Sequence, residues 1–134
     1  MASLSAFLHP EQTGNKEVVV SERFKENGEV VPFVIRPLTQ EENAVLLKAY
    51  RKVDKGTGIE IFNRVGYNQA MVAAAVVEPD LNNAELQKAW GVLGPENVLT
   101  AMLYVGEYSR LMEEVQKLSG LDTDINDEIE EAKN

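Results

Sequence analysis

The sequence predicts an α+β fold that is mostly α-helical, with five to six helices after one N-terminal β-hairpin. The hairpin is indicated by an Asn-Gly turn at 27–28 between two valine-rich stretches. The helices are indicated by apolar residues at helical spacing over 39–133, interrupted by prolines, glycines and capping residues. A chain of 134 residues can bury one modest core. We therefore expect a single domain over 1–134.

The N-terminal segment 1–16 is expected to be flexible. Residues 3–9 can form one or two helical turns, which Pro10 would end, and 11–16 are polar with a glycine at position 14. The apolar residues near the start are interrupted by serines and follow no basic stretch, which is unlike a secretion signal.

The β-hairpin is predicted over 17–36. Val18, Val20 and Phe24 would share one face of its first strand. The second strand, 30–36, contains Pro32, which cannot donate a ladder hydrogen bond and so indicates a free edge. Two strands bury too little to be stable alone, so the hairpin must lie on the helices or on another subunit.

The first long helix is predicted to begin after Thr39. Thr39 and Glu42 have the spacing of a capping box, in which each side chain accepts a hydrogen bond from the other residue's backbone amide. We expect this helix to continue to about Val53 and to be ended by the glycine-rich stretch 54–58. Residues 59–62 are ambiguous between a short extended piece and the approach to the next helix.

Three further helices are predicted from start and stop signals. An apolar helix over 63–77 would be ended by Pro79. Asn82 would cap a short helix that Gly91 closes. Pro95 suits the first position of the following helix.

Two helices are predicted near the C-terminus. Gly106 and Glu107 would separate the preceding helix from an amphipathic one that begins at Tyr108 and ends at Gly120. Thr123 or Asp124 would cap a last helix.

The composition indicates an acidic protein. The net charge is -9, of which residues 122–134 contribute -5. Such a charge repels phosphate, so neither nucleic acid nor anionic lipid is an expected partner. The longest apolar run, 70–77, is too short to span a bilayer. The chain has no cysteine, which excludes disulfides, thiolate catalysis and cysteine-ligated metals.

The sequence offers no convincing catalytic, cofactor-binding or metal-binding group, so we expect a non-enzyme without cofactors. The single histidine, His9, lies beside a proline in the flexible segment. Paired glutamates are adjacent in sequence and would point about 100° apart on a helix. The glycine-rich 55–58 lacks the Walker spacing. Asp122, Asp124 and Asn126 lack the glycine and the glutamate that a calcium loop requires.

The stretch 78–108 carries the candidate partner-binding residues. It combines three short helices with large apolar side chains, and tyrosine and tryptophan are enriched in interfaces. Aromatic residues of this kind can equally belong to the core. The candidates are Leu81, Trp90, Leu103, Tyr104, Val105 and Tyr108.

An ordered set of short motifs carries a family resemblance. The motifs are Ser21-Glu22-Arg23-Phe24, Ile35-Arg36-Pro37-Leu38-Thr39, Glu41-Glu42-Asn43, Pro79-Asp80-Leu81-Asn82-Asn83-Ala84-Glu85-Leu86-Gln87, Gly91-Val92, Ala101-Met102-Leu103, Gly106-Glu107-Tyr108 and Glu130-Glu131-Ala132-Lys133-Asn134. Together they resemble the XkdN-like tail assembly chaperones of phages and defective prophages of Gram-positive bacteria. The resemblance covers 3–134 and is weakest over 52–63.

The resemblance implies a binding function. Such chaperones are thought to coat the tape measure protein, a long helical chain with apolar stripes, and to keep it soluble in the host bacterial cytoplasm until tail tube subunits polymerise around it. Members of the group tend to self-associate, and no catalytic or cofactor residue comes with the family. The tape measure protein, the tail tube protein and further copies of the chain are therefore the expected partners.

Two other functions remain open from the sequence. One is a structural tail completion or head–tail connector protein retained in the virion. The other is a small enzyme, which would need a polar site assembled from residues distant in sequence.

Overall fold

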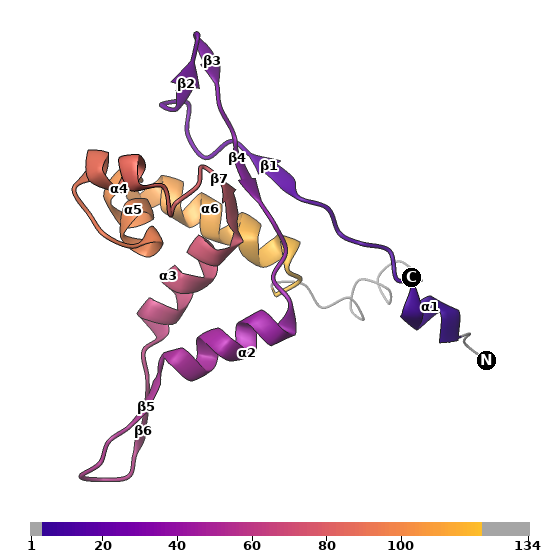
Figure 1. Cartoon of the computed structure of the whole chain (residues 1–134), viewed down its shortest axis with the longest axis vertical. Helices are drawn as coiled ribbons and strands as arrows, with labels where there is room; N and C mark the ends of the chain where they lie inside the picture. Colours follow the sequence, from indigo (N-terminus) through magenta and orange to yellow (C-terminus); the bar gives the residue numbers. More distant parts are fainter. Residues whose placement is uncertain (1–3, 122–134) are drawn as a thin grey trace, which may run out of the picture.

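A three-stranded antiparallel sheet lies at the centre of the molecule, with helices packed beside it (Figure 1). The computed structural model describes residues 4–121. The sheet has the order β1 (Lys16–Val18), β4 (Phe33–Ile35), β7 (Val76–Glu78). Two separate two-stranded ribbons extend from opposite ends of the long axis of the molecule (Figure 1). Residues 4–121 thus form a mixed α+β structure, with six helices and three small antiparallel sheets.

The prediction of one N-terminal hairpin is imprecise, because the hairpin is broken into two ladders. Strand β1 pairs with β4, whereas β2 (Lys25–Glu26) pairs with β3 (Glu29–Val30). The Asn-Gly turn is confirmed, with φ of 53° at Asn27 and 80° at Gly28. Between the ladders, residues 19–24 on the first arm face only 31–32 on the second. The unequal lengths and the proline at position 32 interrupt the pairing.

A second ribbon was missed in the sequence. Helix α2 (Gln40–Ala49) has the predicted capping box at Thr39 but ends before Tyr50, and not at Val53. The residues that follow form β5 (Arg51–Val53), which pairs with β6 (Glu60–Phe62). Residues 51–53 form a strand instead of continuing the helix because the backbone of 60–62 pairs with them. The β-branched Val53 and Ile61 also fit strands better than helices.

The next helix also ends earlier than predicted. Helix α3 runs over Arg64–Ala75, and Val76 begins β7, which pairs with β4. The central β4 therefore has a neighbour on each side, so the free edge expected for this strand is wrong; Pro32 precedes β4 and lies outside both ladders. The peptide bond between Glu78 and Pro79 is cis.

The three helices predicted from the signals in 78–108 are present, and two of them begin at shifted positions. Helix α4 (Ala84–Trp90) is capped by Asn83, and not Asn82, and is closed by Gly91 with φ of 68°. Pro95 begins α5 (Pro95–Met102) as predicted. Helix α6 (Val105–Leu118) begins three residues before Tyr108, because the Glu107 carboxylate accepts the Tyr104 amide hydrogen at 2.7 Å. The predicted last helix lies outside the described residues.

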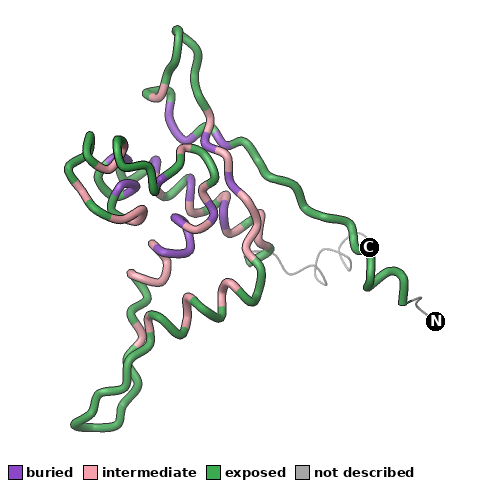
Figure 2. The backbone as a smooth tube through the Cα atoms, viewed as in Figure 1, coloured by how far each residue is buried: buried purple, intermediate pink, exposed green. Residues whose placement is uncertain are grey.

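The hydrophobic core forms where the sheet meets α3, α5 and α6 (Figure 2). Its most deeply buried large side chains have relative exposures below 2%; they are Val20, Ile35, Val72, Val98, Leu99, Leu111 and Val115. Helix α2 buries no residue, and neither does the N-terminal α1 (Leu4–Leu8). Among residues 4–121, no helix is long and apolar enough to cross a membrane.

Candidate partner-binding surface

The corner between α5 and α6, residues 102–108, separates three surface hollows. Met102 lines the first, Tyr104 and Glu107 line the second, and Leu103, Val105 and Tyr108 line the third. The volumes of the hollows are about 450, 600 and 250 Å³. Consecutive residues of one turn therefore reach different sides of the same corner.

The first hollow is the most apolar, and we call it the apolar groove. It lies between the base of the β2–β3 ribbon and α4, and its lining residues are Phe24, Val31, Pro32, Phe33, Glu78, Pro79, Leu86, Trp90 and Met102. Glu78 is the only charged residue of the lining. The Phe24 and Phe33 rings pack together at the floor, with centroids 5.7 Å apart. Trp90 remains 40% exposed at the side formed by α4.

An arginine clamp links the apolar groove to the second hollow. The Arg23 guanidinium binds both carboxylate oxygens of Glu107, with N···O distances of 2.6 and 2.9 Å, and donates to the Met102 carbonyl at 3.0 Å. Its central carbon lies 4.0 Å from the Tyr104 ring centroid and 5.1 Å from that of Phe24. The clamp therefore joins a wall of the apolar groove to the corner.

The clamp favours the ionised form of Glu107. The hydrogen bonds from Arg23 are the main cause that lowers the pKa of Glu107 from 4.5 to about 2, against the opposing effect of desolvation. A second bidentate pair fixes the start of α2: Arg36 binds Glu42 at 2.6 and 3.0 Å and lowers its pKa to about 2. Both pairs hold the preceding chain against the start of a helix.

Tyr108, which lines the third hollow, has a buried hydroxyl. Tyr108 is half-buried, and its Oη is inaccessible and has no hydrogen-bond partner among the described residues. Burial raises the pKa of this phenol. The hollow is otherwise lined by Leu103, by Val105, which is 87% exposed, and by polar residues of α3, α5 and α6.

Of the six candidate residues, two are buried, three are exposed and Tyr108 is intermediate. Leu81 and Leu103 are buried, with exposures of 3% and 8%, so they belong to the core beneath the stretch 78–108. Trp90, Tyr104 and Val105 are exposed, with exposures of 40, 66 and 87%. Trp90 and Tyr104 lie at hollows that the clamp connects, whereas Tyr108 lies in the third hollow with Val105.

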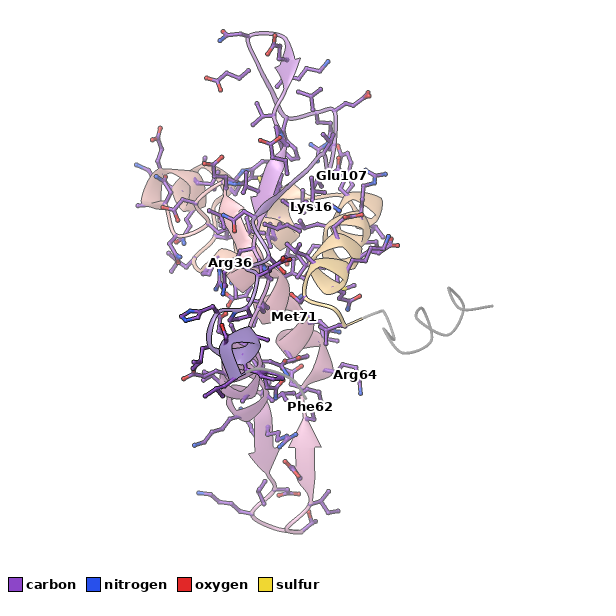
Figure 3. The ribbon with its side chains drawn as sticks, turned by 90° about the vertical axis from the view of Figure 1, so that its right-hand side faces the viewer. Lys16, Arg36, Phe62, Arg64, Met71 and Glu107 are labelled. Atoms are coloured by element: carbon purple, nitrogen blue, oxygen red, sulfur yellow. The ribbon has the colours of Figure 1, made fainter. Side chains whose placement is uncertain are left out.

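The sequence analysis did not identify most of the groove lining, nor the residues of the clamp, among them Arg23, Phe24 and Glu107. All three belong to the motifs Ser21-Glu22-Arg23-Phe24 and Gly106-Glu107-Tyr108, which the fold brings together across 84 positions. An arginine in one motif and a glutamate in another were the available signal. Figure 3 shows Glu107 at the level of the central helices, far from Phe62 and Arg64 near the β5–β6 ribbon. No group of three or more potential metal ligands occurs within residues 4–121.

Comparisons with known proteins concern the family and the fold. The family model described as phage XkdN-like tail assembly chaperone protein matches residues 4–133. The phage-like element PBSX protein XkdN of Bacillus subtilis (strain 168) is 29% identical, over 96% of this chain and 93% of its own length. The uncharacterized protein YqbN of the same organism is 31% identical, over 96% and 92%.

A solved structure supports the fold. The crystal structure of the protein YqbN superposes with a TM-score of 0.76 and 24% identity, covering 91% of this chain and 99% of that one. The structural likeness concerns the fold alone, but the family model extends over nearly the whole sequence. The chain therefore belongs to the phage XkdN-like tail assembly chaperone family.

Proposed function

We propose that this chain is a non-enzymatic chaperone that binds the phage tape measure protein and keeps it soluble during tail assembly. The family points to phage tail proteins as partners and to a role without catalysis. The apolar groove is the observation that supports the finer proposal. Its size and apolar lining suit two or three side chains from the apolar stripe of a helix.

The charge of the chain supports the same proposal. A chaperone that covers apolar stripes needs apolar surface for its client, and it needs net charge to keep the complexes apart. The apolar groove supplies the first, and the net charge of -9 supplies the second. We propose that Trp90 and Tyr104 contact the client directly, and that Leu81 and Leu103 hold the surface in place.

The single tryptophan of the chain makes binding directly measurable. Because Trp90 is the only tryptophan and lies in the groove, its fluorescence reports on that site alone. A synthetic amphipathic segment of the cognate tape measure protein that lacks tryptophan should shift the emission to shorter wavelength and saturate. An unchanged spectrum for peptides that tile the whole tape measure protein would contradict binding in the groove.

Co-expression tests the chaperone role. The wild-type chain should raise the soluble yield of the full-length tape measure protein, and Trp90→Glu should abolish the gain. Leu93→Glu is the matched control, because Leu93 is 83% exposed beyond Gly91 and does not line the groove. Equal loss with both variants would show that added charge, and not the groove, is responsible.

The remaining parts of the proposal concern place and other partners. We propose action in the host bacterial cytoplasm, self-association along the client, and release when tail tube subunits take over the tape measure chain. The alternative is a tail completion or connector protein. Quantitative mass spectrometry of purified particles separates the two, since a connector stays in the virion at fixed stoichiometry and a chaperone does not.

A further inference from the structure

The two β-ribbons are the most exposed parts of the fold. They extend from opposite ends of the long axis, and both views place them apart from the central helices (Figures 1 and 3). Every residue over 51–61 is exposed, and so is every residue over 25–31 (Figure 2). Isolated two-stranded ribbons are marginally stable in water, and their free strand edges remain unpaired. Both ribbons would therefore gain from a partner.

The β5–β6 ribbon is basic and apolar, although the chain is acidic. The ribbon itself, 51–62, contains three cations and two carboxylates, a net charge of +1. With the adjoining ends of α2 and α3, residues 45–65 contain five cations and two carboxylates, a net charge of +3, so the rest of the chain carries -12. Glu60 pairs with Arg51 at 3.3 Å, whereas Lys52 and Lys55 form no ion pair with any described residue. Five large aliphatic side chains are 56–67% exposed here; they are Val45, Val53, Ile59, Ile61 and Val65.

The β2–β3 ribbon has the opposite charge. Glu22, Glu26 and Glu29 lie on or beside it, against Arg23 and Lys25, and Arg23 is already held by Glu107. The register places Glu26 directly opposite Glu29, where like charges repel. A cation from outside the chain would relieve this repulsion.

We propose that the basic β5–β6 ribbon of one copy docks on the acidic β2–β3 ribbon of a second copy. The two ribbons of one chain cannot meet, because they lie at opposite ends of the same molecule (Figure 1). Contact between two different surfaces is heterologous. Two docked copies therefore keep one free ribbon of each kind between them, and further copies can add at both ends. The inference rests on the self-association proposed above and is independent of tape measure binding.

Charge exchange on the full-length chain tests this contact. The variants are Lys52→Glu with Lys55→Glu, Glu26→Lys with Glu29→Lys, and all four changes in one chain. Sedimentation velocity should show that the average mass of the wild type rises with concentration and falls with added salt. Each double variant should weaken association about tenfold, because two exposed ion pairs are replaced by repulsions. The fourfold variant should recover it.

The controls separate a specific contact between ribbons from a general effect of charge and from unfolding. Glu85→Lys with Glu96→Lys makes the same charge change as the acidic-ribbon variant, outside both ribbons, and should leave association unchanged. Circular dichroism confirms that every variant is folded. A wild type that stays monomeric at all concentrations overturns the proposal, and so does a fourfold variant that fails to recover. The proposal is also overturned if only Lys52→Glu with Lys55→Glu weakens association and the exchange at Glu26 and Glu29 does not. The basic ribbon would then meet another acidic segment.

Discussion

Replacing Tyr108 by phenylalanine should stabilise the protein. The Tyr108 hydroxyl is buried without a partner among the described residues, and burial raises its pKa. A buried polar group without a hydrogen bond has lost its hydration and gained nothing in exchange. Removing the oxygen and leaving the ring should raise the free energy of unfolding by about 1 kcal/mol. For a chain of this length that corresponds to an increase in Tm of about 3–6 °C.

Two other tyrosines provide matched controls, for which a loss of stability and no change are expected. The Tyr67 hydroxyl donates to Asn43 Oδ1 between α3 and α2, so Tyr67→Phe should cost about 1 kcal/mol. Tyr104 is 66% exposed and its ring would keep the contact with Arg23, so Tyr104→Phe should change stability by less than about 0.5 kcal/mol. Urea unfolding with an unchanged m-value compares all three variants on one scale.

The order of the three results decides whether the reasoning holds. Stabilisation by Tyr108→Phe, no change at Tyr104 and a loss at Tyr67 would agree with the hydrogen-bond assignments. If Tyr108→Phe instead costs as much as Tyr67→Phe, the Tyr108 hydroxyl has a partner and the third hollow is more polar than its lining indicates.

Two further predictions concern packing and pH. Gly66→Ala should destabilise the protein by about 1–3 kcal/mol, because a Cβ there would lie 2.7 Å from the Tyr50 ring. Gly106→Ala should instead stabilise α6 by up to about 1 kcal/mol, because a Cβ there would meet nothing within 4 Å. One thermal scan compares the two variants. Glu107 and Glu42 have pKa values near 2, below the ordinary 4.5, so their stabilising effect is complete above about pH 4.5 and is lost as pH falls toward 2. Unfolding followed from pH 5 to 2 should show this loss, and Glu107→Gln should make it shallower; an identical slope in the variant would contradict the clamp.

The helices were predictable because their signals are local. The capping box at Thr39, the glycine at position 91 and the proline at position 95 each act within one turn of chain, and the structure has them as predicted. The start of α6 was misplaced because the glycine at position 106 suggested a break. A glutamate at the third helical position, bonded back to the Tyr104 amide, holds the helix through that glycine.

The strands were less predictable because their partners are distant in sequence. Val76 and Val77 continue an apolar helical pattern, and only β4, about 40 residues earlier, makes them a strand. Arg51 to Val53 likewise follow a helix without a break, and the pairing with residues 60–62 decides their conformation. In both segments helix competes with strand, and the pairing with a distant strand decides the outcome. Local helix propensity does not contain that information.

The candidate surface was only partly predicted, because it too depends on contacts between residues distant in sequence. Large apolar residues in 78–108 indicated the right region, but burial depends on what packs above each side chain. Leu81 and Leu103 are covered, whereas Trp90 and Val105 are not. The opposite wall of the groove comes from Phe24 and Val31, which lie in the hairpin region and carried no sign of proximity.

The motifs that carried the family resemblance have a physical explanation in this chain. Arg23 and Glu107 form one bidentate pair, and Arg36 and Glu42 form another, so four motif residues hold loops against helix starts. Of the two pairs, Arg23 and Glu107 position the surface, and the exposed Trp90 is available to contact a partner. Because Arg23 touches both Phe24 and Tyr104, a break in the clamp would move the groove wall and the corner together. Arg23→Gln should therefore weaken the tape measure peptide in the Trp90 assay while the core stays folded, whereas Arg36→Gln should leave binding unchanged.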